Sequence, residues 1–327
     1  MTEIASGPPG SGIQAGRRPE AIKAIPVRHY GRWLSGAVVL AVIADLGYTV
    51  ATAKVRWDVS ANYLFNKLIR EGAVLTVELT VAAMAIGIVL GAILAVMRLS
   101  PNPVTSWVSS FYVWFFRGTP VLVQIFFWFN LNSILPNIGL GVLPNGPWLW
   151  HESTNVLISP ITAAILGLGL NEAAYMAEIV RAGIISVELG QTEAAQALGM
   201  TRLTVMRRVV LPQAMRVIIP PTGNETISML KTTSLAFVAA VPELFTRSQQ
   251  IANFNYRVIE LITVASIWYL VMTSVLTVGQ YYIERRFARG TQRELPPTPF
   301  QSFRRMFFTY HAPSPWPASA SADSERR

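Results

Sequence analysis

Long runs of uncharged, apolar residues constrain the fold of this chain more than any other feature of its sequence. Residues 73–97, for example, contain a single charged side chain, that of Glu78. A run of about 18 or more such residues is long enough to cross a bilayer as a helix. Charged residues make up only 14% of the chain, whereas soluble domains usually carry about a quarter. We therefore predict an all-α, polytopic transmembrane protein.

About six segments of the sequence meet this description and are predicted to span the membrane. They comprise residues 33–53, 73–97, 121–135, 158–180, 209–241 and 258–283. In the second segment, Gly87 and Gly91 form a small-residue step that lets another helix approach closely. Two glycines at this spacing also occur by chance, so a step without any packing role is the alternative.

The basic residues indicate how the chain lies in the membrane. Lys and Arg are concentrated in residues 1–32, 98–117, 181–216 and 285–327. Because cytoplasmic segments carry the excess of Lys and Arg, we predict that these four segments and both termini are cytoplasmic. The Trp-rich loop at 136–157 then lies on the outer side. The net charge of +9 is therefore attributed to topology and lipid headgroups rather than to nucleic-acid binding.

The sequence lacks the residues that metal, redox or ATPase chemistry requires. It has no cysteine, which excludes disulfides and thiolate ligands. His29, His151 and His311 lie in the tails and in a loop, away from any acidic cluster. A Gly-x-x-x-x-Gly-Lys-Ser/Thr phosphate loop is also absent, so any ATP must be bound by another protein. We expect no enzymatic activity, no metal and no cofactor bound by this chain.

A polar, alanine-rich segment lies between the fourth and fifth predicted spans, on the cytoplasmic side. Residues 190–200 read Gly-Gln-Thr-Glu-Ala-Ala-Gln-Ala-Leu-Gly-Met. Alanine favours a short helix of small cross-section, and Gly199 suits the left-handed position that ends a helix. Thr201 is then placed to cap a second helix that runs through Arg207. Such a helix could dock on another protein, or it could be a solvated loop helix without a partner.

One face of the fourth predicted span carries polar side chains. The residues on this face are spaced i, i+3, i+4 and i+7, and they are Asn171, Ala174, Tyr175 and Glu178. A charged side chain at the centre of a membrane costs about 2.5–3.5 kcal/mol, so Glu178 should face a cavity or a partner. Glu178 could line a polar pocket, or it could simply pair with Arg181 one turn further on.

Several further motifs follow one another in the sequence. They are Arg-Gly-Thr-Pro at 117–120, Val-Gln at 123–124, Ala-Tyr-Met-Ala-Glu-Ile-Val-Arg at 174–181, Glu-Ala-Ala at 193–195, Leu-Pro at 211–212, Ile-Ser at 227–228, Lys-Thr-Thr-Ser-Leu-Ala at 231–236 and Val-Pro-Glu-Leu at 241–244. With these motifs, about residues 65–285 resemble the integral membrane permease subunit of ATP-binding-cassette (ABC) importers, in the polar amino-acid uptake family. The N-terminal 60 residues, the loop at 136–157 and the C-terminal tail lie outside the resemblance.

The resemblance implies an assembly of several subunits in the inner (cytoplasmic) membrane of a bacterium. The chain would pair with a second permease subunit, either its own copy or a sister chain. A dimer of ABC ATPases would bind ATP and Mg²⁺ on the cytoplasmic side, and a periplasmic or lipid-anchored amino-acid-binding protein would deliver the substrate. A secondary transporter driven by an ion gradient is the alternative, since it also shows broken helices and intramembrane charges.

The resemblance also implies roles for individual residues. Those matching the ATPase-coupling motif are Glu193, Ala194, Ala195, Gly199, Leu211 and Pro212. Those expected to bind substrate are Asn171, Ala174, Tyr175, Glu178, Thr232 and Ser234, with Glu178 facing the α-ammonium group. Many family members carry Asp where this chain has Thr232. The neutral side chain favours polar neutral or acidic amino acids over cationic ones, unless Thr232 faces lipid or another helix.

These predictions divide the chain into four parts. A basic N-terminal tail at 1–32, predicted to be disordered, precedes an extra N-terminal transmembrane helix and linker at 33–62. An importer permease domain follows at 63–289, with a core of five spanning helices and the coupling segment at 183–212. A C-terminal tail at 290–327, also predicted to be disordered, ends the chain.

Overall fold

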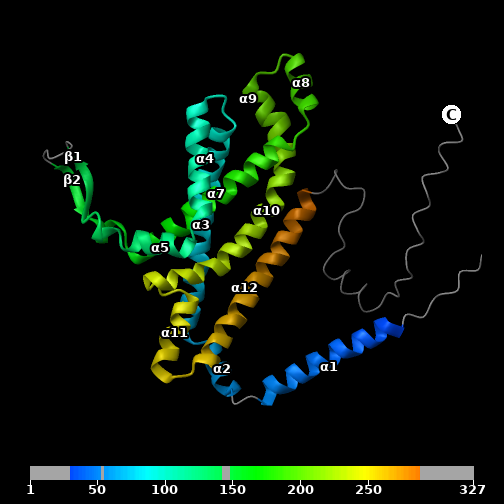
Figure 1. Ribbon diagram of the computed structural model, residues 1–327, viewed down its shortest axis with the longest axis vertical. Coiled ribbons are helices and arrows are strands. Elements are labelled where there is room, and N and C mark those ends of the chain that lie inside the picture. The colour runs from blue at the N-terminus through cyan, green and yellow to red at the C-terminus, as the bar shows by residue number, and fades with distance from the viewer. Residues whose placement is uncertain (1–29, 53–54, 142–147, 288–327) are drawn as a thin grey trace, which may run out of the picture. The chain divides into compact units, whose positions relative to one another are not determined.

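The computed structural model of the protein describes residues 30–52, 55–141 and 148–287, and these are almost entirely helical (Figure 1). The chain divides into two compact units at the bond between Lys54 and Val55. The two predicted tails lie outside the described residues, apart from the last three positions of the N-terminal one.

The first unit contains one described helix, α1 (Tyr30–Thr52). Its apolar stretch Leu34–Thr52 has no buried residue within the structure. Because a helix with apolar side chains on all sides needs an apolar surrounding, α1 fits the predicted extra N-terminal transmembrane helix.

The second unit contains all the other described helices and a small sheet. Its elements are α2 (Trp57–Leu64), α3 (Lys67–Arg98), α4 (Pro103–Gly118), α5 (Val121–Phe129), η1 (Leu131–Ser133), β1 (Asn137–Gly141), β2 (Trp148–Ser153), α6 (Thr154–Leu157), α7 (Pro160–Ile185), α8 (Leu189–Ala197), α9 (Arg202–Val205), η2 (Met206–Val210), α10 (Leu211–Thr232), η3 (Thr233–Ala239), α11 (Leu244–Asn255) and α12 (Val258–Phe287). Side chains cap several of these helices; the Asn66 side chain, for example, accepts the Leu68 N–H at 2.9 Å.

Helices α3 and α7 pack directly against each other in the centre of this unit. A β-carbon at Gly87 would lie 2.5 Å from the Glu172 Cγ atom, and one at Gly91 would lie 2.5 Å from the Met176 Cβ atom. Only glycine permits so close an approach of two helices. The packing role predicted for the Gly87–Gly91 step is therefore confirmed.

The apolar core lies around this helix pair and takes in residues from α5, α10, η3 and the residues just after η3. Its buried members are Leu79, Ala83, Met84, Ile125, Ala164, Leu168, Met176, Met229, Ala236, Ala239 and Val241. Because α10 and η3 contribute to the same core as α3 and α7, the N-terminal and C-terminal halves of the unit share one apolar core.

Four helices in the described part of the chain are long and apolar enough to cross a membrane. A fifth crossing results if Arg202–Ala239 and Leu244–Asn255, which bend by 49°, form one broken span. The segment predicted to cross at 121–135 differs from expectation, because its α-helix α5 has only 9 residues. Such a helix extends about 14 Å, roughly half of the hydrocarbon thickness. The polytopic helical fold is confirmed, and the sixth crossing stays a prediction.

A two-stranded antiparallel hairpin, β1–β2, occupies part of the predicted loop at 136–157 and departs from the all-α expectation. Gly139 pairs with His151, and a β-carbon at position 139 would collide with the backbone of Trp150 and His151. At the base of the hairpin, the Thr154 N–H donates to the Pro136 carbonyl at 3.0 Å. The strands were not predicted because β1 is short and two of its five residues are glycine, which is depleted in strands.

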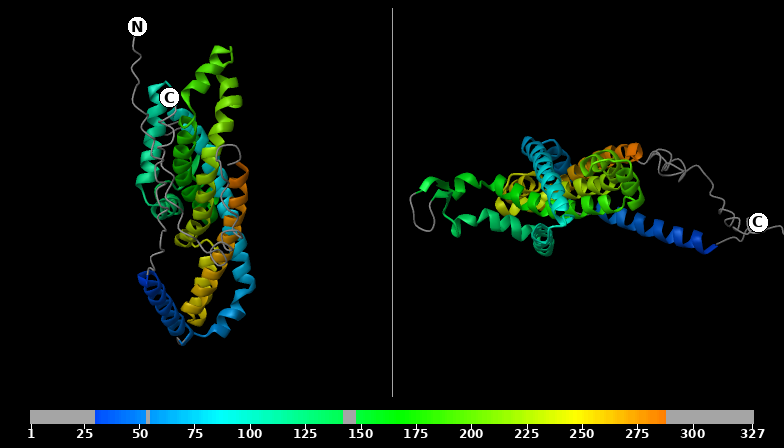
Figure 2. Two further views of the ribbon diagram at one scale, coloured as in Figure 1. Left: turned by 90° about the vertical axis from the view of Figure 1, so that its right-hand side faces the viewer. Right: turned by 90° about the horizontal axis from the view of Figure 1, so that it is seen from above.

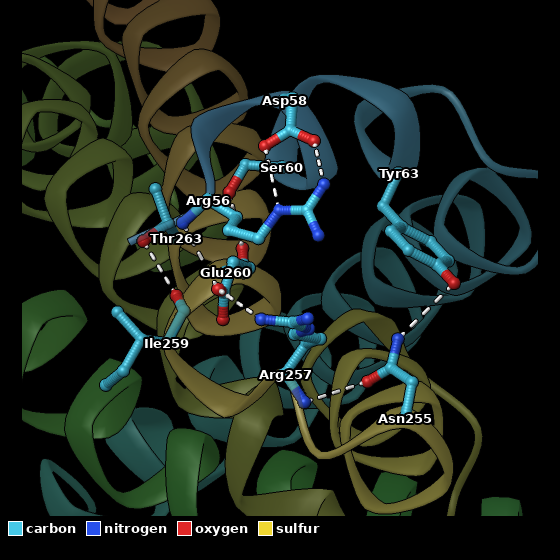
Figure 3. Close-up of polar contacts among 9 residues, drawn as sticks. All are labelled: Arg56, Asp58, Ser60, Tyr63, Asn255, Arg257, Ile259, Glu260 and Thr263. Carbon is cyan, nitrogen blue, oxygen red and sulfur yellow. Dashed lines mark hydrogen bonds and ion pairs between the residues drawn. The ribbon is translucent and has the colours of Figure 1, made fainter. Parts of the chain in front are cut away.

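Helix α2 and the residues just before it pack on the start of α12 (Figure 3). The Arg56 N–H donates to the Glu260 side chain at 3.3 Å, and the Ser60 hydroxyl donates to the Glu260 carbonyl at 3.3 Å. The Trp268 indole N–H donates to the Leu64 carbonyl at 2.7 Å. Residues 55–62, which the sequence assigned to a linker, are thus folded with the second unit.

The two ends of the second unit are formed by different elements. Helices α8 and α9 project at one end, and α2 lies with the turn between α11 and α12 at the opposite end (Figure 1, Figure 2). Helices α8 and α9 of the predicted coupling segment therefore lie at one end of the second unit.

Candidate functional site

The helix end predicted at Gly199 is present in the structure. Gly199 adopts a φ of 78°, in the left-handed region. Its N–H donates to the Gln196 carbonyl at 2.9 Å, and the next N–H, of Met200, donates to the Ala195 carbonyl at 3.2 Å. These two bonds form a Schellman motif, which satisfies carbonyls at the end of α8. The glycine thereby turns the chain sharply from α8 into α9.

Helix α9 is continuous with the following span, although the sequence predicted two separate helices. The Thr201 hydroxyl accepts the Thr204 N–H at 3.4 Å at the start of α9. The chain then passes through one π-helical stretch, η2, into α10, where Pro212 occupies the first turn. Proline has no N–H to donate to the preceding turn, and a wider π turn accommodates this loss. α9, η2 and α10 therefore form one uninterrupted helical segment.

The predicted coupling residues divide into a packed set and an exposed set. Ala195 is buried against Val205 and Val210, so α8 rests on α9 and η2. The other coupling residues are exposed, and they are Glu193, Ala194, Gly199, Leu211 and Pro212.

Large apolar side chains are also exposed on the α8–α9 projection. Leu198 and Leu189 are 84% and 77% exposed. A groove of about 430 Å³ runs beside them, lined by residues that include Ile185, Leu189, Val205 and Met206. Apolar surface exposed on a projection of this kind is typical of a protein-docking site.

Glu178, on the polar face of α7, is held between two arginines. Its carboxylate forms an ion pair with Arg98 of α3 and a second one with Arg181, whose Nη2 and Nε atoms lie 2.8 and 3.0 Å from Oε2. The pairing with Arg181 that the sequence left open is therefore present, and the pairing with Arg98 was not predicted.

Asn171 and Tyr175 contact the break between α4 and α5. The Asn171 amide donates to the Phe116 carbonyl at 2.8 Å, and the Gln124 amide donates to the same carbonyl at 3.0 Å. The Arg117 guanidinium lies over the Tyr175 ring, 5.1 Å from its centroid, which is a cation–π geometry. A groove of about 410 Å³ opens at this point, lined by residues that include Arg98, Arg117, Tyr175 and Glu178.

Thr232 and Ser234 use their hydroxyls within their own segment. The Thr232 hydroxyl donates to the Ser228 carbonyl at 2.9 Å, and the Ser234 hydroxyl donates to the Lys231 carbonyl at 2.7 Å. The structure thus brings Tyr175 and Glu178 to the groove. It leaves Asn171 bonded to Phe116, Ala174 buried in an apolar cluster, and Thr232 and Ser234 bonded to their own backbone.

Two carboxylates of the helix bundle, Glu172 and Glu225, were not among the predicted site residues. Glu172 of α7 is 3% exposed, and its Oε1 atom has no hydrogen-bond partner among the described residues. Glu225 of α10 interacts electrostatically with Glu172 and with Arg117. The available signal was the presence of a charge within an otherwise apolar run. Glu172 lies on a face of α7 next to the one that contains Glu178, so the i, i+3, i+4, i+7 spacing of the polar face does not include it.

Residues 87–289 match the family of binding-protein-dependent transport system inner membrane components. The chain belongs to this family. The arginine transport system permease protein ArgU of Corynebacterium glutamicum is 48% identical over 299 residues, which cover 90% of this permease and 91% of ArgU. The glutamine transport system permease protein GlnP of Escherichia coli is 33% identical over 231 residues, covering 71% of this permease and 98% of GlnP.

A solved structure agrees with these relatives. The crystal structure of an amino acid ABC transporter with histidines superimposes with a TM-score of 0.60 at 33% identity, covering 71% of this permease and 99% of the matched chain. The permease is therefore a subunit of an amino-acid ABC importer, a multi-pass membrane protein and a transport component rather than an enzyme. Membership of the family implies an ATPase and a substrate-binding protein as partners.

Proposed function

We propose that the permease carries amino acids from the periplasm to the cytoplasm across a bacterial inner membrane, with both termini cytoplasmic. A dimer of partner ATPases supplies the energy by hydrolysing ATP with Mg²⁺, and this chain binds neither. A periplasmic or lipid-anchored receptor delivers the substrate, and a second permease subunit, identical or a sister chain, completes the pathway.

The α8–α9 projection carries this proposal. Its exposed leucines, and the groove of about 430 Å³ that Leu189 helps to line, offer an apolar surface on which an ATPase can dock. Ala195 packs on Val205 and Val210, and η2 leads without a break into α10. Closure of the ATPase dimer would therefore pull on α10 and move it relative to α7, which is how domain closure drives a transition between two states.

The substrates that we propose are cationic amino acids. ArgU, at 48% identity over most of both chains, is named for arginine, whereas GlnP, at 33%, is named for glutamine. The two intramembrane carboxylates, Glu172 and Glu225, also suit a positively charged substrate. Together these observations outweigh the neutral Thr232, which on its own favoured polar neutral or acidic amino acids.

The substrate roles predicted for residues of α7, α10 and η3 stay predictions. Arg117 is exposed at the groove and is positioned to bind a substrate carboxylate. Glu178 has both carboxylate oxygens paired with arginines. It can meet a substrate α-ammonium group only if Arg98 or Arg181 releases it. Asn171 and Tyr175 would position Arg117 through the break at Phe116 and through the cation–π contact.

Reconstitution tests the proposed function. The permease is incorporated into proteoliposomes with its ATPase and its receptor, and uptake of radiolabelled arginine, lysine and glutamine is followed with and without ATP. We expect uptake that requires ATP, the ATPase and the receptor. Uptake by the permease alone under a proton or sodium gradient would contradict the proposal and would support a secondary transporter.

A further inference from the structure

A groove of about 450 Å³ runs between α10 and α12. Its lining includes Val275, Gly279 and Ile283 of α12, and Ile219 and Ile227 of α10. A β-carbon at Gly279 would meet no atom within 4 Å, so the groove is open there. Because an empty apolar groove forfeits dispersion contacts, an apolar group from outside the chain should fill it in the membrane.

The polar side chains that line the groove already have hydrogen-bond partners. The hydroxyls of Thr222 and Thr226 each donate to the carbonyl four residues earlier in α10, at 2.8 and 2.9 Å. The Gln280 amide of α12 donates to the Pro220 carbonyl of α10 at 3.3 Å. With these groups satisfied, the groove suits a hydrocarbon chain better than a polar ligand.

Two arginines lie at the same level, at one end of the groove. Gly223 of α10 packs against Gln280 of α12, where an added β-carbon would be 2.8 Å from the amide carbon. From this contact, α10 reaches Arg216 and α12 reaches Arg286 after about 9–11 Å at 1.5 Å per residue. Both lie toward the α8–α9 end of the unit, because the two helices run side by side in opposite directions (Figure 1, Figure 2).

Helical spacing places these arginines on the two faces that form the groove. Arg216 comes three residues before Ile219, and Arg286 comes three residues after Ile283, so each shares a helix face with a lining residue. Both arginines are exposed. Glu284, also on α12, is half-buried and accepts the Gln280 amide at 2.6 Å. The two arginines therefore give this mouth of the groove a positive charge.

An anionic phospholipid has the matching distribution of charge and apolar surface. From Val275 to Ile283 the groove extends about 12 Å along α12, close to the roughly 15 Å of hydrocarbon in one leaflet. Arginine binds phosphate through paired N–H groups, and basic pockets between spanning helices bind anionic headgroups. A second copy that docked through the same groove around an axis along the membrane normal would bring its own arginines to this level, where like charges repel.

We propose that the α10–α12 groove binds one acyl chain of an anionic phospholipid, whose phosphate is bound by Arg216 and Arg286. The lipid thereby bridges α10, which continues the coupling segment, to α12. The leaflet rests on the proposed function, since the orientation proposed there places both arginines at the cytoplasmic surface.

Lipid titration tests the phosphate contacts. The purified permease–ATPase complex is delipidated in detergent and titrated with dioleoyl phosphatidylglycerol or dioleoyl phosphatidylcholine, and bound lipid is counted by native mass spectrometry. Arg216→Gln and Arg286→Gln should each weaken phosphatidylglycerol binding about fivefold, the effect of one basic residue near a headgroup, and leave phosphatidylcholine binding unchanged. Arg285→Gln is the matched control, because Arg285 lies off the groove face and contacts the Tyr281 hydroxyl at 3.4 Å.

A variant that fills the groove tests the acyl-chain contacts. Gly279→Leu should weaken the binding of both lipids about tenfold, because its side chain enters the space that the acyl chain would occupy. Its thermal unfolding temperature should stay near that of the wild type, and Gly279→Ala should retain most of the binding. A phosphatidylglycerol with a photoreactive diazirine at the chain end should label peptides that contain Ile227 or Val275, and should not label them in Gly279→Leu.

Three results would overturn the lipid site. The first is an unchanged preference for phosphatidylglycerol in both arginine variants. The second is full lipid binding, or unchanged photolabelling, in Gly279→Leu. The third is a disulfide between two permease subunits in the Val275→Cys variant, which would assign the groove to a second copy. A wild-type complex that binds the lipid but shows no ATP-driven amino-acid uptake in proteoliposomes would instead remove the proposed function and leave the lipid site intact.

Discussion

Gly87 on α3 lies directly against Glu172 on α7, at a distance that leaves no room for a β-carbon. The same step brings Gly91 against Met176, so two helices that are far apart in the sequence approach at their backbones. The contact does more than close the bundle. It also fixes the position of the buried Glu172 carboxylate beside α3.

Enlarging this glycine should therefore destabilise the permease. We expect Gly87→Ala to lower the free energy of unfolding by about 1–3 kcal/mol, the usual cost of overpacking, and to lower arginine binding with it. Thermal unfolding in detergent measures the first effect. Gly279→Ala is the control, because a β-carbon there would meet no atom within 4 Å. Equal unfolding temperatures for both variants would show that α3 and α7 do not need the close approach.

Gly199 should be required for its conformation rather than for its small size. Its β-carbon would meet nothing within 4 Å, but its φ of 78° is strained for residues with side chains. Gly199→Ala should cost about 1–2 kcal/mol at the end of α8 and reduce ATP-coupled uptake, and Gly199→Asn should cost less. Gly190→Ala, also in open space, serves as the control. Full uptake in Gly199→Ala would mean that the turn from α8 into α9 does not depend on this glycine.

The two ion pairs of Glu178 should be measurable as a coupled set. Glu178→Gln is expected to destabilise the permease by about 1–3 kcal/mol, since it weakens charge-assisted hydrogen bonds to Arg98 and Arg181 in a half-buried site. A double-mutant cycle of Glu178→Gln with Arg98→Gln, followed by thermal unfolding, isolates the pair between α3 and α7. Additive effects of the two substitutions would show that this ion pair contributes nothing to stability.

The absence of cysteine from the sequence makes the chain suited to site-directed labelling. Leu198→Cys, at a position 84% exposed on the α8–α9 projection, should form cross-links with the partner ATPase. Leu149→Cys, at a position 83% exposed on the hairpin, should react with a membrane-impermeant maleimide added outside and should not cross-link to the ATPase. The reverse pattern of labelling would contradict the predicted orientation.

Much of the helical fold could be predicted because it depends on local chemistry. Apolar runs marked the long helices, and the requirement for glycine at a left-handed position marked the end of α8 at Gly199. The close approach at Gly87 and Gly91 followed from the small size of glycine.

The features that were not predicted depend mainly on contacts between segments that are distant in the sequence. Arg98 and Glu178 are 80 residues apart, so no local pattern could pair them. The burial of Glu172 depends on which face of α7 meets α3, and helical spacing alone selected the neighbouring face. The hairpin at β1–β2 was missed because β1 is short and rich in glycine, a residue depleted in strands.

Coupled uptake by the complete importer tests the central claim most directly. Wild-type permease, ATPase and receptor are reconstituted in proteoliposomes, and radiolabelled arginine uptake is compared with that of the same assembly carrying Glu193→Arg, a charge reversal on the exposed side of α8. The account predicts ATP-dependent uptake by the wild type, and loss of uptake in the variant with arginine binding to the receptor intact. Uptake that persists without ATP, or at full rate in Glu193→Arg, would contradict it.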